Sequence, residues 1–248
     1  MKKIICSVLV LIMMLTLVAC PEPPEDIYTK SEGVMTWEEY NAAKINDEVK
    51  IEAYVQGKQD WWSDNGVGKA TIYLQDGVGG YLLYNLNCTE EEYNKLTVGT
   101  KVRASGYKAV YKGEYEIIDA TFEILEGNYV APFTDATDKL GKDELLKLQN
   151  MKVAFKGLTF VSLDYQGGAR GKDIYVIFSL NGQNYEFCVE SYLTGPDSEL
   201  YKAVEALTEG AAVDVEGFAY WYDGAYDDVN DVTTHAGINT HITGITVK

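Results

Sequence analysis

The sequence has few basic residues. It contains 21 Lys and Arg against 38 Asp and Glu, which gives a formal charge of −17, and it has only two histidines. Proteins that bind nucleic acids neutralise phosphate groups with Lys and Arg, so this balance disfavours a nucleic-acid partner. It also disfavours electrostatic attraction to anionic lipid headgroups.

Cysteines are too few for a disulfide framework. Of the four, Cys6 and Cys20 belong to the N-terminal segment, which leaves Cys88 and Cys188. A bridge between these two would have to join separate domains. We interpret them instead as two buried thiols, because free cysteine is commonly buried.

The sequence also lacks a catalytic or metal-binding motif. His235 and His241 lie six positions apart near the C-terminus, without the Cys or His residues that would complete a zinc site. No activated Ser or Cys accompanies them. Residues 77–80 are glycine-rich but lack the Lys-Ser/Thr and helix of a phosphate-binding loop. We therefore predict a protein that is not an enzyme and that requires no cofactor.

A hydrophobic run long enough to remain a transmembrane helix is absent too. Residues 4–18 are mostly apolar, but crossing ~30 Å of hydrocarbon needs about 20 such residues. Lys2 and Lys3 precede the run, as in the charged and apolar regions of an export signal. The sequence predicts a signal peptide over residues 1–19.

The run ends in Leu-Val-Ala-Cys at residues 17–20, which resembles the lipobox of bacterial lipoproteins. The resemblance implies that Cys20 is lipid-acylated, becomes the first residue after cleavage and anchors the protein to the outer face of a membrane in the cell envelope. Two or more acyl chains make such an anchor stable. An ordinary secretory signal peptide, cleaved after a small residue, is the alternative.

Three prolines follow the proposed anchor, at positions 21, 23 and 24. Because proline fixes φ, we expect residues 20–34 to form the lipid anchor and an extended Pro-rich tether. Residues 1–19 contain two lysines and no acid, so a chain that begins at Cys20 has a formal charge of −19.

The remainder contains one structural unit twice. Short alternating or apolar runs bounded by Gly, Asn and Asp predict the strands, with a helix after the third strand of each copy. The first copy has strands at 49–55, 70–76, 80–86, 101–107 and 115–125, and a helix at 89–96. The second copy has strands at 151–157, 173–179, 183–189, 212–218 and 241–247, and a helix at 198–207.

The two copies match best where the helix passes into the fourth strand. Residues 96–107 align without gaps to residues 207–218, with Leu, Thr, two Gly and Val at identical spacing. Each copy also has an amphipathic lead-in, at 37–43 and at 143–148. Before the first lead-in, Thr36 and Glu39 have the spacing of a capping box.

Three strands, a helix and two strands is the order of the OB-fold, a small Greek-key barrel. The chain resembles the tandem OB-fold lipoproteins and extracellular proteins of bacteria. The expected fold is mainly β, with two tandem five-stranded OB-fold-like Greek-key barrels, each with a helix between strands three and four. We place domain 1 at 35–130, a linker at 131–140, where Pro132 and polar residues cluster, and domain 2 at 141–248.

OB-folds bind ligands through strands two and three and through the loops between strands one and two and strands four and five. Those loops, predicted here at 59–66, 107–115 and 220–231, are rich in aromatic residues. The candidate ligand-binding residues are Trp61, Trp62, Tyr107, Tyr111, Tyr115, Tyr220, Trp221 and Tyr222. Such flat faces suit sugar rings or peptides; alternatively, they seal the barrel ends or the domain interface.

The last loop is also acidic. Closely spaced carboxylate and amide oxygens are what Ca²⁺ requires, although the spacing matches no EF-hand. The candidate ligands are Asp223, Asp227, Asp228, Asn230 and Asp231. A solvated acidic turn is the alternative.

These features favour a lipid-anchored, extracytoplasmic binding protein that captures a neutral glycan or a peptide. A structural or partner-docking lipoprotein of the envelope is the alternative, in which the aromatic residues would form a protein interface. A single-stranded nucleic-acid-binding or nuclease-accessory protein follows from the fold by analogy alone, and the charge disfavours it.

Overall fold

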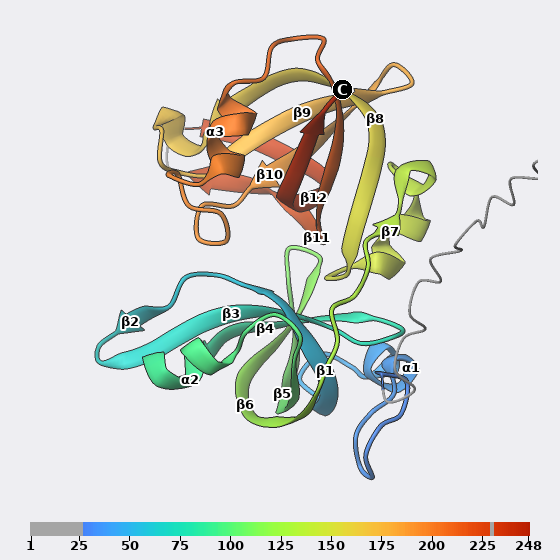
Figure 1. Cartoon of the computed structure of the whole chain (residues 1–248), viewed down its shortest axis with the longest axis vertical. Helices are drawn as coiled ribbons and strands as arrows, with labels where there is room; N and C mark the ends of the chain where they lie inside the picture. Colours follow the sequence, from blue (N-terminus) through green and yellow to red (C-terminus); the bar gives the residue numbers. More distant parts are fainter. Residues whose placement is uncertain (1–26, 229–230) are drawn as a thin grey trace, which may run out of the picture.

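The computed structural model describes residues 27–228 and 231–248, with only the backbone described for residues 221–228 and 231–239. Figure 1 shows two barrels, one formed by the first half of the chain and one by the second. None of the described helices is long and apolar enough to cross a membrane.

The first barrel is closed by five strands. Their ring order is β1–β3–β4–β6–β5 and back to β1, with β4 and β6 parallel and the other pairs antiparallel. Helix α2 lies between β4 and β5 in the chain, and β2 extends the sheet beside β3. The elements are β1 (Glu48–Lys58), β2 (Trp62–Asp64), β3 (Val67–Gln75), β4 (Gly80–Asn87), α2 (Glu90–Lys95), β5 (Thr100–Tyr111) and β6 (Glu114–Asn128).

The second barrel repeats this topology. Its ring order is β8–β9–β10–β12–β11 and back to β8, again with one parallel pair, β10 and β12. The elements are β8 (Lys152–Tyr165), η4 (Gln166–Gly168), β9 (Ile174–Leu180), β10 (Gln183–Val189), α3 (Glu199–Glu205), β11 (Ala212–Asp228) and β12 (Asp231–Val247). The predicted fold of two tandem OB-fold-like barrels, each with a helix between strands three and four, is therefore confirmed.

Each barrel encloses its own hydrophobic core. In the first, inward-facing residues such as Ile51, Ile72 and Leu74 are fully buried; in the second, Phe155, Phe178 and Phe187 fill the centre. Burying a side chain of this size stabilises the fold by about 1.5–3 kcal/mol, and Phe187 meets both other rings edge-on. Closure of the barrels leaves few free strand edges.

Two repeated glycines explain the best-matching segment of the two copies. Gly99 and Gly210 follow the helices with φ of 94° and 85°, a conformation that is costly for residues with a Cβ. Gly106 and Gly217 lie at bulges in the fourth strand, where a Cβ would meet a backbone oxygen of the fifth strand at 2.6 Å and 2.2 Å. Both pairs are therefore required by the barrel backbone.

Short helices precede and interrupt the strands. Helix α1 (Trp37–Ala42) begins with the predicted capping box, in which the Thr36 hydroxyl accepts from the Glu39 amide and the Glu39 carboxylate accepts from the Thr36 amide. A six-residue helix is marginal alone, so the packing of Tyr40 on the barrel stabilises it. The second lead-in forms the 3₁₀ helix η3 (Asp143–Leu148).

Two of the predicted loops are β-hairpins. Strands β5 and β6 leave only Lys112 and Gly113 between them, both with positive φ, as in the type I′ turns that match strand twist. Strands β11 and β12 stay paired beyond Tyr220, as far as Asp228 and Asp231. The predictions of loops at 107–115 and 220–231 were wrong, because the Tyr, Trp and Val residues of these segments favour strand pairing.

The predicted segment boundaries also change. Ile27 and Val34 are buried, and Lys30 Nζ lies 2.5 Å from the Asp76 carboxylate, so residues 27–34 pack on the first barrel and do not belong to a free tether. Strand β7 (Thr134–Asp135) pairs with β8, and η2 (Thr137–Lys139) follows it. Much of the predicted linker therefore belongs to the second domain.

Candidate functional site

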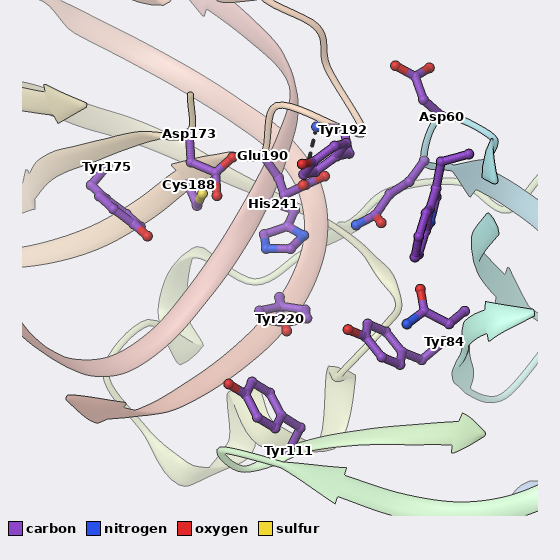
Figure 2. A pocket seen from close by; sticks show the side chains of 13 residues that line it. Asp60, Tyr84, Tyr111, Asp173, Tyr175, Cys188, Glu190, Tyr192, Tyr220 and His241 are labelled. Atoms are coloured by element: carbon purple, nitrogen blue, oxygen red, sulfur yellow. Dashed lines mark hydrogen bonds between the residues drawn. The ribbon is translucent and has the colours of Figure 1, made fainter. Parts of the chain in front are cut away.

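A cleft of about 640 Å³ opens between the two barrels. Figure 2 shows its side chains converging from both domains. The first barrel contributes Gln59, Asp60, Trp62, Tyr84, Asn85 and Tyr111. The second contributes Asp173, Tyr175, Cys188, Glu190, Tyr192, Tyr220 and His241.

Two stacked rings, Tyr220 and His241, form the floor of the cleft, next to the aromatic contact that joins the barrels. Tyr220 lies flat against His241, with ring centroids 4.0 Å apart, and Tyr73 of the first barrel stacks on Phe218 of the second at 4.3 Å. The Tyr73 hydroxyl and His241 Nδ1 are joined by a 2.6 Å hydrogen bond across the domain boundary. Tyr73 therefore docks on the second barrel through Phe218 and His241, and His241 also lines the cleft together with Tyr220.

The floor carries no positive charge at neutral pH. Burial lowers the pKa of His241 to about 3, so its imidazole is neutral. Burial also raises the pKa of Tyr73 and of Tyr220, so both hydroxyls keep their protons. The floor therefore offers aromatic faces and neutral polar atoms.

One wall consists of carboxylates held by backbone amides. Glu190 accepts from the amides of Tyr192 and Leu193, at 3.2 Å and 2.7 Å, and Asp173 accepts from the amide and hydroxyl of Ser191. Burial, reinforced by Asp173, raises the pKa of Glu190 to about 7. This wall can accept hydrogen bonds and tolerates a cationic group.

Cys188 lines the cleft as a thiol. It is buried, and burial raises its pKa well above the ordinary value, so it lacks the thiolate character of a nucleophile. Cys88 is buried in the first barrel, and neither cysteine is in a disulfide. The interpretation of Cys88 and Cys188 as two buried thiols is confirmed.

The rim is aromatic and exposed, with Trp62, Tyr84, Tyr111 and Tyr192 turned partly to solvent. Figure 2 shows Tyr111 rising from the β5–β6 hairpin towards Tyr220. Among the described residues that line the cleft there is no Lys or Arg. The cleft can stack on an apolar face and exchange hydrogen bonds, but it cannot neutralise a phosphate.

The structure brings together three of the predicted residues, Trp62, Tyr111 and Tyr220. Trp61 lies elsewhere: it is half-buried against the first core, and its indole Nε1 donates to the Cys88 carbonyl at 3.1 Å. Tyr107 is exposed outside the cleft, whose lining does not include it. The side chains of Trp221 and Tyr222 lie outside the described residues.

Several residues that form the walls of the cleft were not among the residues predicted from the sequence. Tyr84 lies on β4, the third strand of the first barrel. Asp173 and Tyr175 lie at the start of β9, and Glu190 lies directly after β10, the second and third strands of the second barrel. The strand faces of OB-folds were a general signal for these positions. Tyr192 could not be found this way, because it lies in the connection after β10 and meets the cleft only through domain docking: its carbonyl accepts from the Asp60 amide.

The side chains proposed as calcium ligands, Asp223, Asp227, Asp228, Asn230 and Asp231, lie outside the described residues. Within the described part of the chain, no group of three or more His, Cys, Asp or Glu residues is placed to hold a metal ion. The backbone of these candidates, apart from Asn230, runs in the β11–β12 hairpin and is not an open loop.

The structural neighbours described here are distant in sequence. No protein-family model and no curated protein matches the chain. A replication protein A heterotrimer bound to single-stranded DNA matches 84% of this chain at 11% identity and a TM-score of 0.34, and this chain spans 51% of that one.

Two further neighbours are domains bound to double-stranded DNA. A murine DNA-binding protein matches 80% of this chain and 94% of its own, at 10% identity and a TM-score of 0.36. The Ifi202 HINa domain with 20 base pairs of DNA matches 82% and 99%, at 10% identity and a TM-score of 0.37. Such low scores carry no argument about the ligand of this chain.

Proposed function

We propose that this chain is a non-catalytic binding protein, tethered by lipid on Cys20 to the outer face of a bacterial membrane, that captures a neutral glycan or a peptide between its barrels. The observation that carries the proposal is the cleft itself. It collects aromatic rings from both barrels, places carboxylates and amides beside them, and has no Lys or Arg among its described lining residues.

The chemistry of the cleft fits these ligand classes. Sugar rings stack their C–H faces on aromatic side chains, while their hydroxyls donate to carboxylates such as Asp173. Peptides stack similarly and donate through backbone amides. A volume of about 640 Å³ lies within the usual range of roughly 300–1,000 Å³ for ligand sites.

A protein partner is the second candidate, favoured by the exposed aromatic rim. Tyr111 and Tyr192 have 53% and 61% of their surface exposed, and Trp62 and Tyr84 are exposed beside them. Aromatic clusters of this kind also mark protein interfaces. A stoichiometric envelope protein recovered with the wild-type chain, and lost with Trp62→Ala, would favour this candidate.

A nucleic-acid ligand is disfavoured. The three solved neighbours described above contain DNA, but the formal charge of this chain is −17 and its cleft presents Asp60, Asp173 and Glu190. Contacts to phosphates require cationic side chains. Salt-sensitive binding of a single-stranded oligonucleotide at the cleft would reverse this judgement.

The proposal is tested by a matched pair of variants on the β5–β6 hairpin. Tyr111 lines the cleft, whereas Tyr107 is similarly exposed, at 47% against 53%, and does not line it. On glycan and peptide arrays, we expect Tyr111→Ala to lose about tenfold or more of the affinity for the bound ligand, since removing an aromatic stacking face costs roughly 1–3 kcal/mol.

Tyr107→Ala should bind as the wild type does. Equal losses in the two variants, or wild-type binding by Tyr111→Ala, would contradict the placement of the ligand. Melting temperatures of both variants provide the control for folding.

A further inference from the structure

The ionisable acids that line the cleft between the barrels have no basic counterpart there. Asp60 comes from the first barrel, Asp173 and Glu190 come from the second, and no Lys or Arg is among the described lining residues. A neutral sugar would bring no charge to balance these carboxyl groups. The lining therefore discriminates between ligands that its size and its aromatic rings would accept equally.

The carboxyl groups of the two barrels act on the same wall. Burial, together with the negative charges of Asp173 and Asp60, raises the pKa of Glu190 to about 7. Burial also raises the pKa of Cys188, and Asp173 and Glu190 add to this rise. Figure 2 shows Asp173, Cys188 and Glu190 side by side on this wall. A cation placed against it would be attracted by carboxyl groups of both barrels.

Backbone amides hold the two carboxylates of this wall in position. Glu190 accepts from the amides of Tyr192 and Leu193, and both of its oxygens are used. Asp173 accepts from the amide and the hydroxyl of Ser191, at 2.9 Å and 2.7 Å, and both bonds use Oδ1. An ionised carboxylate has about four acceptor positions, so Asp173, which is only partly buried, can accept further hydrogen bonds from a ligand.

The aromatic rim is suited to a cation as well. Its exposed rings are those of Trp62, Tyr84, Tyr111 and Tyr192. Trp62 already binds one cation within the chain: Lys69 Nζ lies 5.3 Å from the centre of the indole and 3.6 Å from the Asp64 carboxylate. A ring and a carboxylate thus hold an ammonium group at the edge of the cleft, and the tyrosine rings lie beside carboxylates in the same way.

We propose that the ligand of the cleft is a peptide that inserts an arginine side chain between the barrels. Its guanidinium group donates to the Asp173 carboxylate and lies against a tyrosine ring of the rim. The inference rests on the proposed function and specifies its ligand, as a cationic peptide in place of a neutral glycan.

Arginine fits this lining better than lysine does. A guanidinium group is planar, so it can stack on a ring while its edge donates to a carboxylate, and it is more weakly hydrated than an ammonium group. Both properties suit a partly buried wall where the acceptor and the rings lie close together. Hydrogen bonds between ionised partners are also stronger than those between neutral groups.

The test uses the peptide acetyl-Gly-Gly-Arg-Gly-Gly-amide and two relatives, in which citrulline or lysine replaces arginine. Citrulline keeps the shape of the arginine side chain but is neutral. In NMR titrations of the full chain, the arginine peptide should bind saturably, and about tenfold or more tightly than the citrulline peptide, because its hydrogen bond is charge-assisted. The lysine peptide should bind with intermediate affinity.

A matched pair of variants locates the contact. Asp173→Asn keeps an Oδ1 acceptor for Ser191 and should weaken binding of the arginine peptide about tenfold, while binding of the citrulline peptide stays as in the wild type. Asp138→Asn should bind all three peptides as the wild type does, since Asp138 has 79% of its side chain exposed and does not line the cleft. Melting temperatures of both variants control for folding.

Equal binding of the arginine and citrulline peptides by the wild type, or no saturable binding of the arginine peptide, would overturn the inference whatever the variants do. Equal losses in Asp173→Asn and Asp138→Asn would also overturn it. Tighter binding of the lysine peptide would overturn the choice of arginine. A neutral glycan that binds the wild type and is lost with Tyr111→Ala would contradict the cationic ligand but leave the proposed function standing.

Discussion

Glu116 shows how burial of a single residue sets the pH response of this fold. Its side chain on β6 is 4% exposed, and burial raises its pKa from 4.5 to about 7. The folded state therefore holds the proton more tightly than the unfolded state does. The stability that this gives is complete below pH 4.5 and is lost as the pH rises through about 7.

Replacing Glu116 by Gln should remove this dependence. We expect the free energy of unfolding of Glu116→Gln, relative to the wild type, to increase between pH 4.5 and pH 8 by up to about 3 kcal/mol. His241 and Glu190 titrate in both proteins and cancel in the difference. Urea denaturation at several pH values measures this difference in the free energy of unfolding. A difference that does not change with pH would contradict the raised pKa of Glu116.

The adjacent residues Trp61 and Trp62 show that the sequence could not tell which of two neighbouring side chains lines the cleft. Trp61 and Trp62 were both candidate ligand-binding residues, but only Trp62 is exposed at the cleft. Which of them faces the cleft depends on β2, which begins at Trp62 and pairs with β3, while the Trp61 indole donates to the Cys88 carbonyl. A three-residue strand of this kind leaves no periodic signal in the sequence.

At the scale of elements, the fourth strand of each barrel carries a glycine whose place a larger residue cannot take. Gly217 lies at a bulge, where a Cβ would lie 2.2 Å from the His241 carbonyl oxygen. The His241 carbonyl carbon and the Thr240 side chain would each lie 2.9 Å from it as well, so there is no room for a Cβ. The glycine that recurs in the two copies is therefore a packing requirement of the barrel.

Gly217→Ala should lower the free energy of unfolding by about 1–3 kcal/mol or more, the usual cost of overpacking. Gly195→Ala is the matched control, because its Cβ would have no neighbour within 4 Å, and we expect a change within about 0.5 kcal/mol. Chemical denaturation compares the two. Equal effects would mean that the close approach at Gly217 is not limiting.

The order of the elements was predictable because each barrel follows period-two patterning bounded by turn residues. The hairpin at 112–113 was not, since Lys-Gly is a weak turn signal beside the Asn-Gly that type I′ turns prefer. The extension of β11 and β12 was missed for another reason. Its acidic composition suggested a loop, whereas its Tyr, Val and Thr residues pair as strands.

At the scale of the molecule, the cleft exists only because two barrels dock. The Tyr73–His241 hydrogen bond joins residues 168 positions apart, and neither residue was a predicted site residue. Contacts of such separation depend on how the two domains pack, which internal repeats do not specify. The sequence therefore predicted several residues of the site, but it did not predict that they lie together in a cleft between the two barrels.

The anchor is tested on the whole molecule. In a lipoprotein-processing bacterium, Cys20→Ala should move the protein from the membrane fraction to the soluble extracytoplasmic fraction, because the acyl chains are lost and a −19 surface gives no electrostatic attraction to anionic lipids. Fractionation and immunoblotting measure the distribution. Recovery of Cys20→Ala wholly with the membrane would contradict the lipid anchor.

The central claim is that the ligand lies between the barrels, and ¹⁹F NMR of protein labelled with 3-fluorotyrosine tests it most directly. On titration with the strongest glycan or peptide from the arrays, resonances of Tyr84, Tyr111, Tyr192 and Tyr220 should shift together and saturate. Tyr107 should not move. Shifts at Tyr107 without shifts at Tyr111 and Tyr220 would contradict the account.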